Sequence, residues 1–213
     1  MRPPRAIYVC IASGPSLNEA DCEAVKEWRH AETEETRRVI VINTSFKRAP
    51  WADVLYACDS VWWDRYLVEV KEVFKGELWS QDPLIDQSKG IRRIEGARAP
   101  GLGREKIHFG GNSGYQAINC AYLWGADRIV LLGYDMKMMN GQSHWHGDHP
   151  SGLNRGSPLK DWVPQYRPLA ADLKFEGVTA LNATRSTALD CFPVVDLEDA
   201  LCGSFLPEAA LEM

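Results

Sequence analysis

The stretch Ile107–His149, IHFGGNSGYQAINCAYLWGADRIVLLGYDMKMMNGQSHWHGDH, predicts most about the fold of this 213-residue chain. Its glycine-rich start leads into residues 112–114, which open a predicted helix, and apolar side chains between Ala117 and Leu123 then recur at helical spacing. Gly125 follows at a position typical of a helix end. Residues 128–132 form a short apolar run of the kind found in parallel strands buried on both faces. The stretch therefore predicts a helix followed by a buried strand, as in an α/β protein.

The predicted strand at 128–132 ends in Gly133, Tyr134 and Asp135. The loop that follows, residues 136–158, carries three of the five histidines of the chain. In open α/β sheets, ligands bind outside the carboxyl ends of the strands. We therefore expect the chemistry of this protein at Asp135 and in an active-site loop formed by residues 136–158.

A second unit of the same kind opens the chain. Residues 6–12 predict a strand, and the turn Ser13–Leu17 follows it. Ser16 and Glu19 have the spacing of a capping box, which predicts a helix from Ser16 to about His30. The free N–H groups at a helix start can bind an anion. Because every strand–helix unit has such a start, an ordinary turn explains this segment as well as a phosphate site does.

Polar residues end two further predicted strands, Asn43 after residues 38–42 and Asp59 after residues 54–58. Each could serve only as a helix cap. Together with Asp135 they occupy corresponding positions and predict one shared site. The remaining pattern predicts strands at 77–81, 91–95 and 178–183, and helices at 60–74, 159–175 (interrupted at Pro164 and Pro168) and 196–202. The fold class is α/β, a Rossmann-like doubly wound and mainly parallel sheet forming a single domain over residues 1–213.

The composition limits the classes of partner. The net charge of -5 favours no general binding to nucleic acid, and no apolar run approaches the roughly 18 residues of a membrane span. The N-terminal apolar stretch is too short for a signal peptide. The six cysteines are scattered without metal-site spacing and predict buried, reduced thiols, as in a cytoplasmic protein.

The motifs in order are GPSL at 14–17, Asn43, NSG at 112–114, G-x-D at 133–135 and the histidine loop. This series resembles the bacterial sialyltransferases that use CMP-sialic acid. It also resembles a related domain of unknown function typified by archaeal 6-hydroxymethylpterin diphosphokinase. The small size is similar to stand-alone members found in bacteriophages. The resemblance implies a Rossmann-like fold that binds a nucleotide or nucleotide-sugar.

The resemblance also implies roles for particular residues. The turn at 13–16 would hold phosphate, Asn43 would contact the donor, residues 112–114 would meet the nucleotide, and Asp135 would face the nucleoside. The nucleotide-binding residues expected in this way, with the polar strand ends added, are Ser13, Gly14, Pro15, Ser16, Asn43, Asp59, Asn112, Ser113, Gly114, Gly133 and Tyr134. A downstream histidine would act as general base, so the expected catalytic residues are His144, His146, His149, Asp135 and Lys137. Lys137 stands where the sialyltransferases carry a tyrosine, and we expect it to offset charge on a leaving phosphate.

The segment His144–His149 reads H-x-H-x-D-H, the metal-binding signature of metallo-β-lactamase-fold hydrolases. Those enzymes take further histidines from downstream, and no histidine follows His149 here. We therefore interpret the match as convergent. A local site for Zn²⁺ on His144, His146, Asp148 and His149 stays open, as does Mg²⁺ held by carboxylates and substrate phosphates. Ordinary loop histidines are the remaining alternative.

The sequence thus favours a nucleotide-dependent transferase, in the first place a glycosyltransferase with a loop histidine as general base. A metal-dependent diphosphokinase or phosphohydrolase is the second hypothesis, and a non-catalytic nucleotide-binding module is the third. The expected partners are a nucleotide or nucleotide-sugar and a small-molecule or glycan acceptor. A homo-oligomer is left open.

Overall fold

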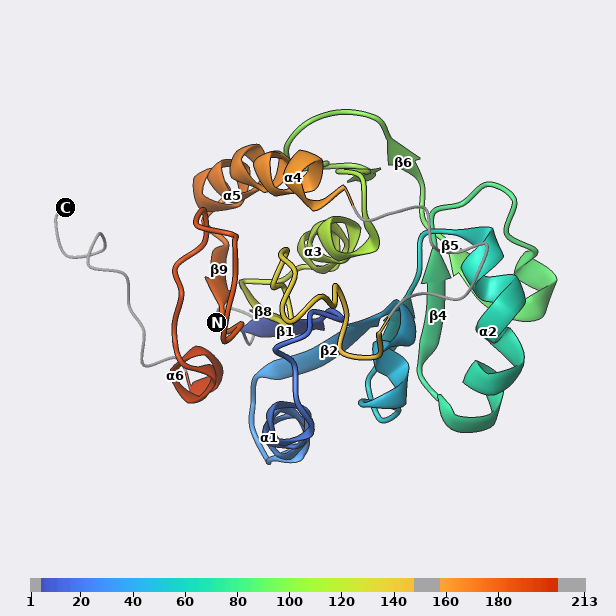
Figure 1. Cartoon of the computed structure of the whole chain (residues 1–213), viewed down its shortest axis with the longest axis horizontal. Helices are drawn as coiled ribbons and strands as arrows, with labels where there is room; N and C mark the ends of the chain where they lie inside the picture. Colours follow the sequence, from blue (N-terminus) through green and yellow to red (C-terminus); the bar gives the residue numbers. More distant parts are fainter. Residues whose placement is uncertain (1–4, 148–157, 203–213) are drawn as a thin grey trace, which may run out of the picture.

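The computed structural model describes residues 5–147 and 158–202 (Figure 1). It confirms the predicted class: one seven-stranded parallel sheet has the order β5-β4-β3-β2-β1-β8-β9, with helices packed on it. The strands are β1 (Ala6–Ile11), β2 (Thr36–Ile42), β3 (Val54–Tyr56), β4 (Glu77–Ser80), β5 (Ile91–Arg93), β8 (Arg128–Leu132) and β9 (Thr179–Asn182). Two short parallel strands that the pattern did not predict, β6 (Gly96–Ala97) and β7 (Ile107–His108), form a separate small sheet.

Helices cover both faces of the sheet. They are α1 (Glu19–His30), α2 (Ser60–Val73), α3 (Ser113–Leu123), α4 (Leu159–Trp162), α5 (Tyr166–Phe175) and α6 (Leu197–Cys202), with short 3-10 turns η1 (Asn43–Lys47), η2 (Gln87–Lys89) and η3 (Val163–Gln165). The predicted interruption near Pro164 is confirmed, because η3 separates α4 from α5. Pro168 instead lies in the first turn of α5, where a proline lacking its N–H is tolerated.

Alternating side chains of the central strands point into two apolar layers. Ile7 and Val9 of β1 pack with α1, α2 and α6, whereas Tyr8 and Cys10 pack with α3 and α5. Figure 1 shows α1 and α6 on one side of the sheet and α3, α4 and α5 on the other. Because both faces are covered, these strands are apolar throughout, as expected of a doubly wound sheet.

The strand order reverses beside β1. From β1 the chain builds outward through β2, β3, β4 and β5, and then returns to place β8 and β9 on the other side of β1. Such a reversal opens a crevice at the carboxyl ends of the strands, where open α/β sheets bind ligands. The polar ends of β1 and β8 meet at this point.

The predicted start of α1 was wrong. The helix begins at Glu19, and the Asn18 side chain caps it by accepting from the Asp21 N–H at 2.8 Å. Ser16 caps nothing, since its hydroxyl has no hydrogen-bond partner among the described residues, while its N–H donates to Asp135 Oδ1 at 2.9 Å. Asparagine is as good a cap as serine, so both positions were possible helix starts. The third predicted strand also ends early, since β3 stops at Tyr56 and the chain then turns into α2.

The six cysteines are free, as predicted, although Cys58 and Cys191 are only partly buried and Cys202 is exposed. Within the ranges that the structure describes, no helix is long and apolar enough to cross a bilayer.

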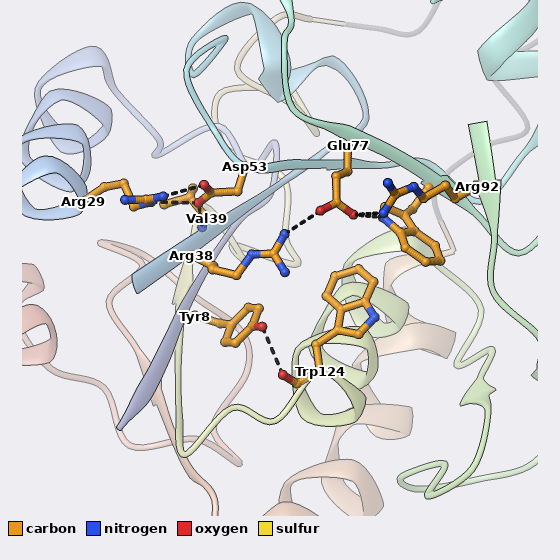
Figure 2. Close-up of polar contacts among 9 residues, drawn as sticks. Tyr8, Arg29, Arg38, Val39, Asp53, Glu77, Arg92 and Trp124 are labelled. Atoms are coloured by element: carbon orange, nitrogen blue, oxygen red, sulfur yellow. Dashed lines mark hydrogen bonds and ion pairs between the residues drawn. The ribbon is translucent and has the colours of Figure 1, made fainter. Parts of the chain in front are cut away.

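An ion-pair network joins neighbouring elements near the amino-terminal ends of the strands (Figure 2). The Asp53 carboxylate, just before β3, accepts from Arg29 of α1 at 2.7 and 2.9 Å and from the Val39 N–H of β2 at 2.7 Å. Beside it, Glu77 of β4 accepts from Arg38 at 3.1 Å and from Arg92 at 2.7 Å. Asp53 therefore joins a helix and two strands through charged hydrogen bonds.

We expect Asp53→Ala to lower the free energy of unfolding by about 2 kcal/mol, because it leaves a partly buried guanidinium and a strand N–H without their acceptor. Urea denaturation measures this change. Asp190→Ala is the matched control, since it removes an ion pair whose side chains are 62% and 66% exposed and should change stability by no more than about 0.5 kcal/mol. Equal losses in the two variants would contradict the role given to Asp53.

Candidate functional site

A pocket of about 330 Å³ lies at the carboxyl ends of β1, β2, β3 and β8. The start of α3, the histidine loop and α4 close it from the other side. Its lining residues are Ala12, Ser13, Gly14, Ile42, Asn43, Cys58, Asp59, Gly111, Asn112, Ser113, Gly114, Gly133, Tyr134, Met136, Ser143, His144, Leu159, Trp162 and Tyr166. Three segments chosen from the sequence, the polar strand ends, the NSG helix start and the histidine loop, thus meet around one cavity.

The structure divides the predicted site residues into three groups. The residues brought to the pocket are Ser13, Gly14, Asn43, Asp59, Asn112, Ser113, Gly114, Gly133, Tyr134 and His144. The residues that do not line it are Pro15, Ser16, Asp135, Lys137 and His146. Asp148 and His149 lie outside the described residues, so their predicted roles stay predictions.

The glycine turn before α3 has a backbone that only glycine fits well. Gly110 and Gly111 have φ angles of 52° and 87°, in the left-handed region. A Cβ at Gly110 would overlap the Tyr115 ring, and one at Gly111 would lie 2.7 Å from the Trp162 indole. The turn is therefore packed tightly between α3 and α4.

Asn112 caps α3. Its Oδ1 accepts from the Tyr115 N–H at 2.9 Å and from the Tyr166 hydroxyl at 2.9 Å. The cap uses the Tyr115 N–H, whereas the N–H groups of Ser113 and Gly114 meet no acceptor among the described residues. Both residues line the pocket at the positive end of the α3 dipole, and helix starts of this kind bind phosphate or carboxylate.

Ser113 joins α3 to two strand ends. Its hydroxyl donates to Asn43 Oδ1 at 3.3 Å and accepts from the Cys58 N–H at 3.1 Å. Asn43 itself has φ of 50°, a conformation that asparagine tolerates better than most residues. Met136, across the pocket, also has φ of 50°. Backbone strain of this kind gathers where the surrounding structure holds a functional geometry.

Backbone N–H groups of the turn after β1 donate hydrogen bonds to acceptors within the protein. The Gly14 N–H donates to the Gly133 carbonyl at 2.8 Å, the Ser16 N–H to Asp135, and the Leu17 N–H to the Gly14 carbonyl at 3.1 Å. The phosphate contacts expected from Gly14 and Ser16 would have to replace these bonds. The start of α3 offers the better anion site.

Asp135 is fully buried and fastens the first turn to the end of β8. Its Oδ2 has no hydrogen-bond partner among the described residues. Burial raises the pKa of Asp135 above the ordinary aspartate value, and the bond from Ser16 opposes this rise. The Asp135 side chain therefore holds the first turn against β8 and does not line the pocket. The sequence predicted instead that it contacts the ligand.

Because the pKa of Asp135 is raised, we expect this group to make the stability of the protein depend on pH. The native state holds this proton at a pH where the unfolded chain has already lost it, so this group's contribution to stability falls as pH rises from about 3.8 through the raised pKa. Asp135→Asn keeps an oxygen for the Ser16 N–H and cannot ionise. We expect the stability of the variant relative to the native chain to improve across that window in urea titrations. Parallel curves for the two proteins would contradict the raised pKa.

Trp145 docks the histidine loop on the sheet. Its N–H donates to the Ser13 carbonyl at 3.0 Å, and the Arg48 guanidinium lies 4.0 Å from the centre of its ring. Ser45 supports the same region by donating to the Ala12 carbonyl at 2.8 Å. This anchor places His144 at the pocket, where its Nδ1 lies 2.9 Å from Ser13 Oγ. The His146 ring stacks behind it, 5.1 Å between centroids with an interplanar angle of 5°.

No group of three or more His, Cys, Asp or Glu side chains suited to a metal ion occurs within residues 5–147 and 158–202. The predicted ligand set includes Asp148 and His149, which lie outside those ranges. The metal hypothesis therefore stays a prediction that needs metal analysis.

Several pocket residues were missed from the sequence. Leu159, Trp162 and Tyr166 come from the segment after the loop, where helical spacing gave no sign of which face meets the pocket. Gly111 was the available signal, because two adjacent glycines before a helix cap indicate a close approach by another group. Cys58 was read as core and proves to lie on the pocket wall.

A larger groove of about 680 Å³ lies at the amino-terminal ends of the strands, away from the carboxyl-end pocket. Arg38 and Arg92 of Figure 2 line it, but both bind Glu77 within the protein. Its other cations, Lys71, Lys75 and Lys89, are surface lysines with flexible side chains. The carboxyl-end pocket is smaller but more enclosed, and its donors are fixed backbone groups, so it is the better candidate site.

No protein-family model, curated protein or solved structure matches this chain. The geometry of the pocket is therefore the basis for assigning a function.

Proposed function

We propose that this protein is a nucleotide-dependent transferase, in the first place a glycosyltransferase, that binds its nucleotide-sugar in the carboxyl-end pocket. One observation carries the proposal: Ser113 and Gly114, at the start of α3, line a pocket at the strand reversal, and their N–H groups have no acceptor among the described residues. Helix starts at this place in doubly wound sheets bind the phosphates of nucleotides.

The pocket would have to bind phosphate without a basic side chain. Its described lining contains no lysine or arginine, so hydrogen bonds and the helix dipole would hold the phosphate. Lys137, expected to offset charge on the leaving group, is not among the lining residues. The N–H groups of α3 take over that role in the proposal.

The pocket also has apolar surface that suits a flat ring. Trp162 and Leu159 of α4, Met136 of the loop and Tyr166 of α5 present mainly apolar surface to the cavity. Ligand pockets combine such walls with a few directed polar groups. A base or sugar ring would pack here while the phosphate rests on α3.

His144 is the proposed general base. For its Nε2 to act as the base, its Nδ1–H would donate to Ser13 Oγ, which lies 2.9 Å away and so orients the ring. The imidazole would take the proton of the acceptor hydroxyl as the acceptor oxygen bonds to the anomeric carbon of the donor. The bond from that carbon to the phosphate oxygen breaks, and the nucleotide leaves with its charge held at α3.

Thermal unfolding with a panel of nucleoside monophosphates, nucleoside diphosphates and nucleotide-sugars tests the proposal. A ligand at 100 times its Kd should add about 2.7 kcal/mol, which raises Tm by roughly 5–10 °C for a chain of this size. Each ligand is measured with and without EDTA. Stabilisation that needs no metal supports the transferase. A response only with Mg²⁺, Mn²⁺ or Zn²⁺ would favour the diphosphokinase or phosphohydrolase, and no response to any nucleotide would overturn the proposal.

A further inference from the structure

Asp59 stands at the N-cap position of α2 without capping it. Its backbone has the extended conformation of an N-cap residue, but its side chain accepts no bond from the helix. Asp82, from the loop after β4, instead accepts the Ser60 N–H at 2.8 Å. An aspartate at this position normally stabilises its helix by capping, whereas the side chain of Asp59, an exposed residue, is left to make other contacts.

That carboxylate faces the candidate site. Asp59 lines the pocket next to Cys58, whose thiol lies 3.3 Å from Asp59 Oδ2. Burial and the Asp59 charge raise the pKa of the Cys58 thiol, so the thiol stays protonated and donates to the carboxylate. Cys58 also donates its N–H to Ser113. Asp59 and the anion site of α3 are therefore linked through one residue.

The charge of Asp59 restricts what can lie beside it. It is the one carboxylate among the described lining residues, and no lysine or arginine lines the pocket with it. Within the described chain it takes part in no ion pair. A phosphate would be repelled from this end and attracted to the start of α3. The part of the ligand at Asp59 must therefore donate hydrogen bonds.

We propose that Asp59 is a specificity residue that accepts hydrogen bonds from the ribose hydroxyls of the bound nucleotide. A carboxylate is acceptor-only and can bind the two hydroxyls of a vicinal diol at once. With the phosphate on Ser113 and Gly114 and the diol on Asp59, a nucleotide has one orientation in the pocket. This inference rests on the proposed function, because it presumes that the pocket binds a nucleotide.

Isothermal titration with the four common 5′-ribonucleoside monophosphates and their 2′-deoxy counterparts tests this inference. We expect the native chain to bind its preferred ribonucleotide about tenfold to hundredfold more tightly than the deoxy compound. Asp59→Asn should weaken ribonucleotide binding and reduce the preference to about threefold or less, with little effect on the deoxy compound. Because Asp59 caps nothing, the variant should keep the native Tm.

Asp64→Asn is the matched control, since Asp64 lies on the same helix with a side chain that is 71% exposed, and it should leave both affinities unchanged. Equal binding of ribose and deoxyribose forms by the native chain would overturn the role of Asp59 and leave the proposed function standing. A preference that survives in Asp59→Asn would do the same. Failure of every nucleotide to bind would remove both proposals.

Discussion

Gly14→Ala should lower the free energy of unfolding by about 3 kcal/mol or more. A Cβ at this position would overlap Asp135 Oδ2 and lie 2.5 Å from the Gly133 carbonyl oxygen. Neither neighbour can withdraw, because Asp135 is buried and bonded to Ser16 and the carbonyl accepts the Gly14 N–H. Urea denaturation measures the loss, which corresponds to a fall in Tm of roughly 6–12 °C.

Gly90→Ala separates this overlap from the general cost of replacing glycine. Gly90 has φ of 82° and nothing within 4 Å of an added Cβ, so its substitution carries only the backbone cost of about 1–2 kcal/mol. Gly14 shows no such backbone requirement, and its cost is steric. If Gly14→Ala proved no more destabilising than Gly90→Ala, the first turn would not be locked against β8 as described.

His144→Ala should lower the rate of transfer from the nucleotide-sugar donor by about 10²–10⁴-fold with little change in donor affinity. The imidazole is the one histidine among the described pocket residues, and Ser13 orients it. Nucleotide release in the presence of acceptor measures the rate, and titration calorimetry measures donor binding. The split between rate and affinity distinguishes a base from a residue that only holds the ligand.

His30→Ala is the control for His144, because His30 is an exposed histidine on α1 whose Nδ1 bonds only to the Lys26 carbonyl of its own helix. It should leave both the rate and the affinity unchanged. Full activity in His144→Ala would exclude His144 as the base.

The fold could be predicted because its signals are local. The apolar run 128–132 became β8 with those bounds, and the alternation of strands and helices led to a parallel doubly wound sheet. The start of α1 could not be predicted in this way, because Ser16 and Asn18 are both good caps, and the structure uses Asn18. The pairing of β6 with β7 likewise depends on segments too short to carry a periodic pattern.

The candidate site followed the sequence in part. The rule that ligands bind at strand ends brought Asn43 and Asp59 to one pocket without any knowledge of contacts, whereas Asp135, the third polar strand end, does not line it. It could not show that the donors of the first turn are used internally, since that depends on the buried Asp135. Nor could it place Trp162 against Gly111, which is a tertiary contact between distant segments.

We propose that the start of α3 binds the phosphate of a nucleotide, and amide chemical shifts test this binding most directly. In an NMR titration of the ¹⁵N-labelled chain with nucleoside monophosphates, we predict the largest shifts at the N–H groups of Ser113 and Gly114, with smaller ones at Asn43 and Asp59. Shifts confined to the surroundings of Arg38, Lys75 and Arg92 would place the ligand in the groove at the amino-terminal ends of the strands. That result would contradict phosphate binding at α3.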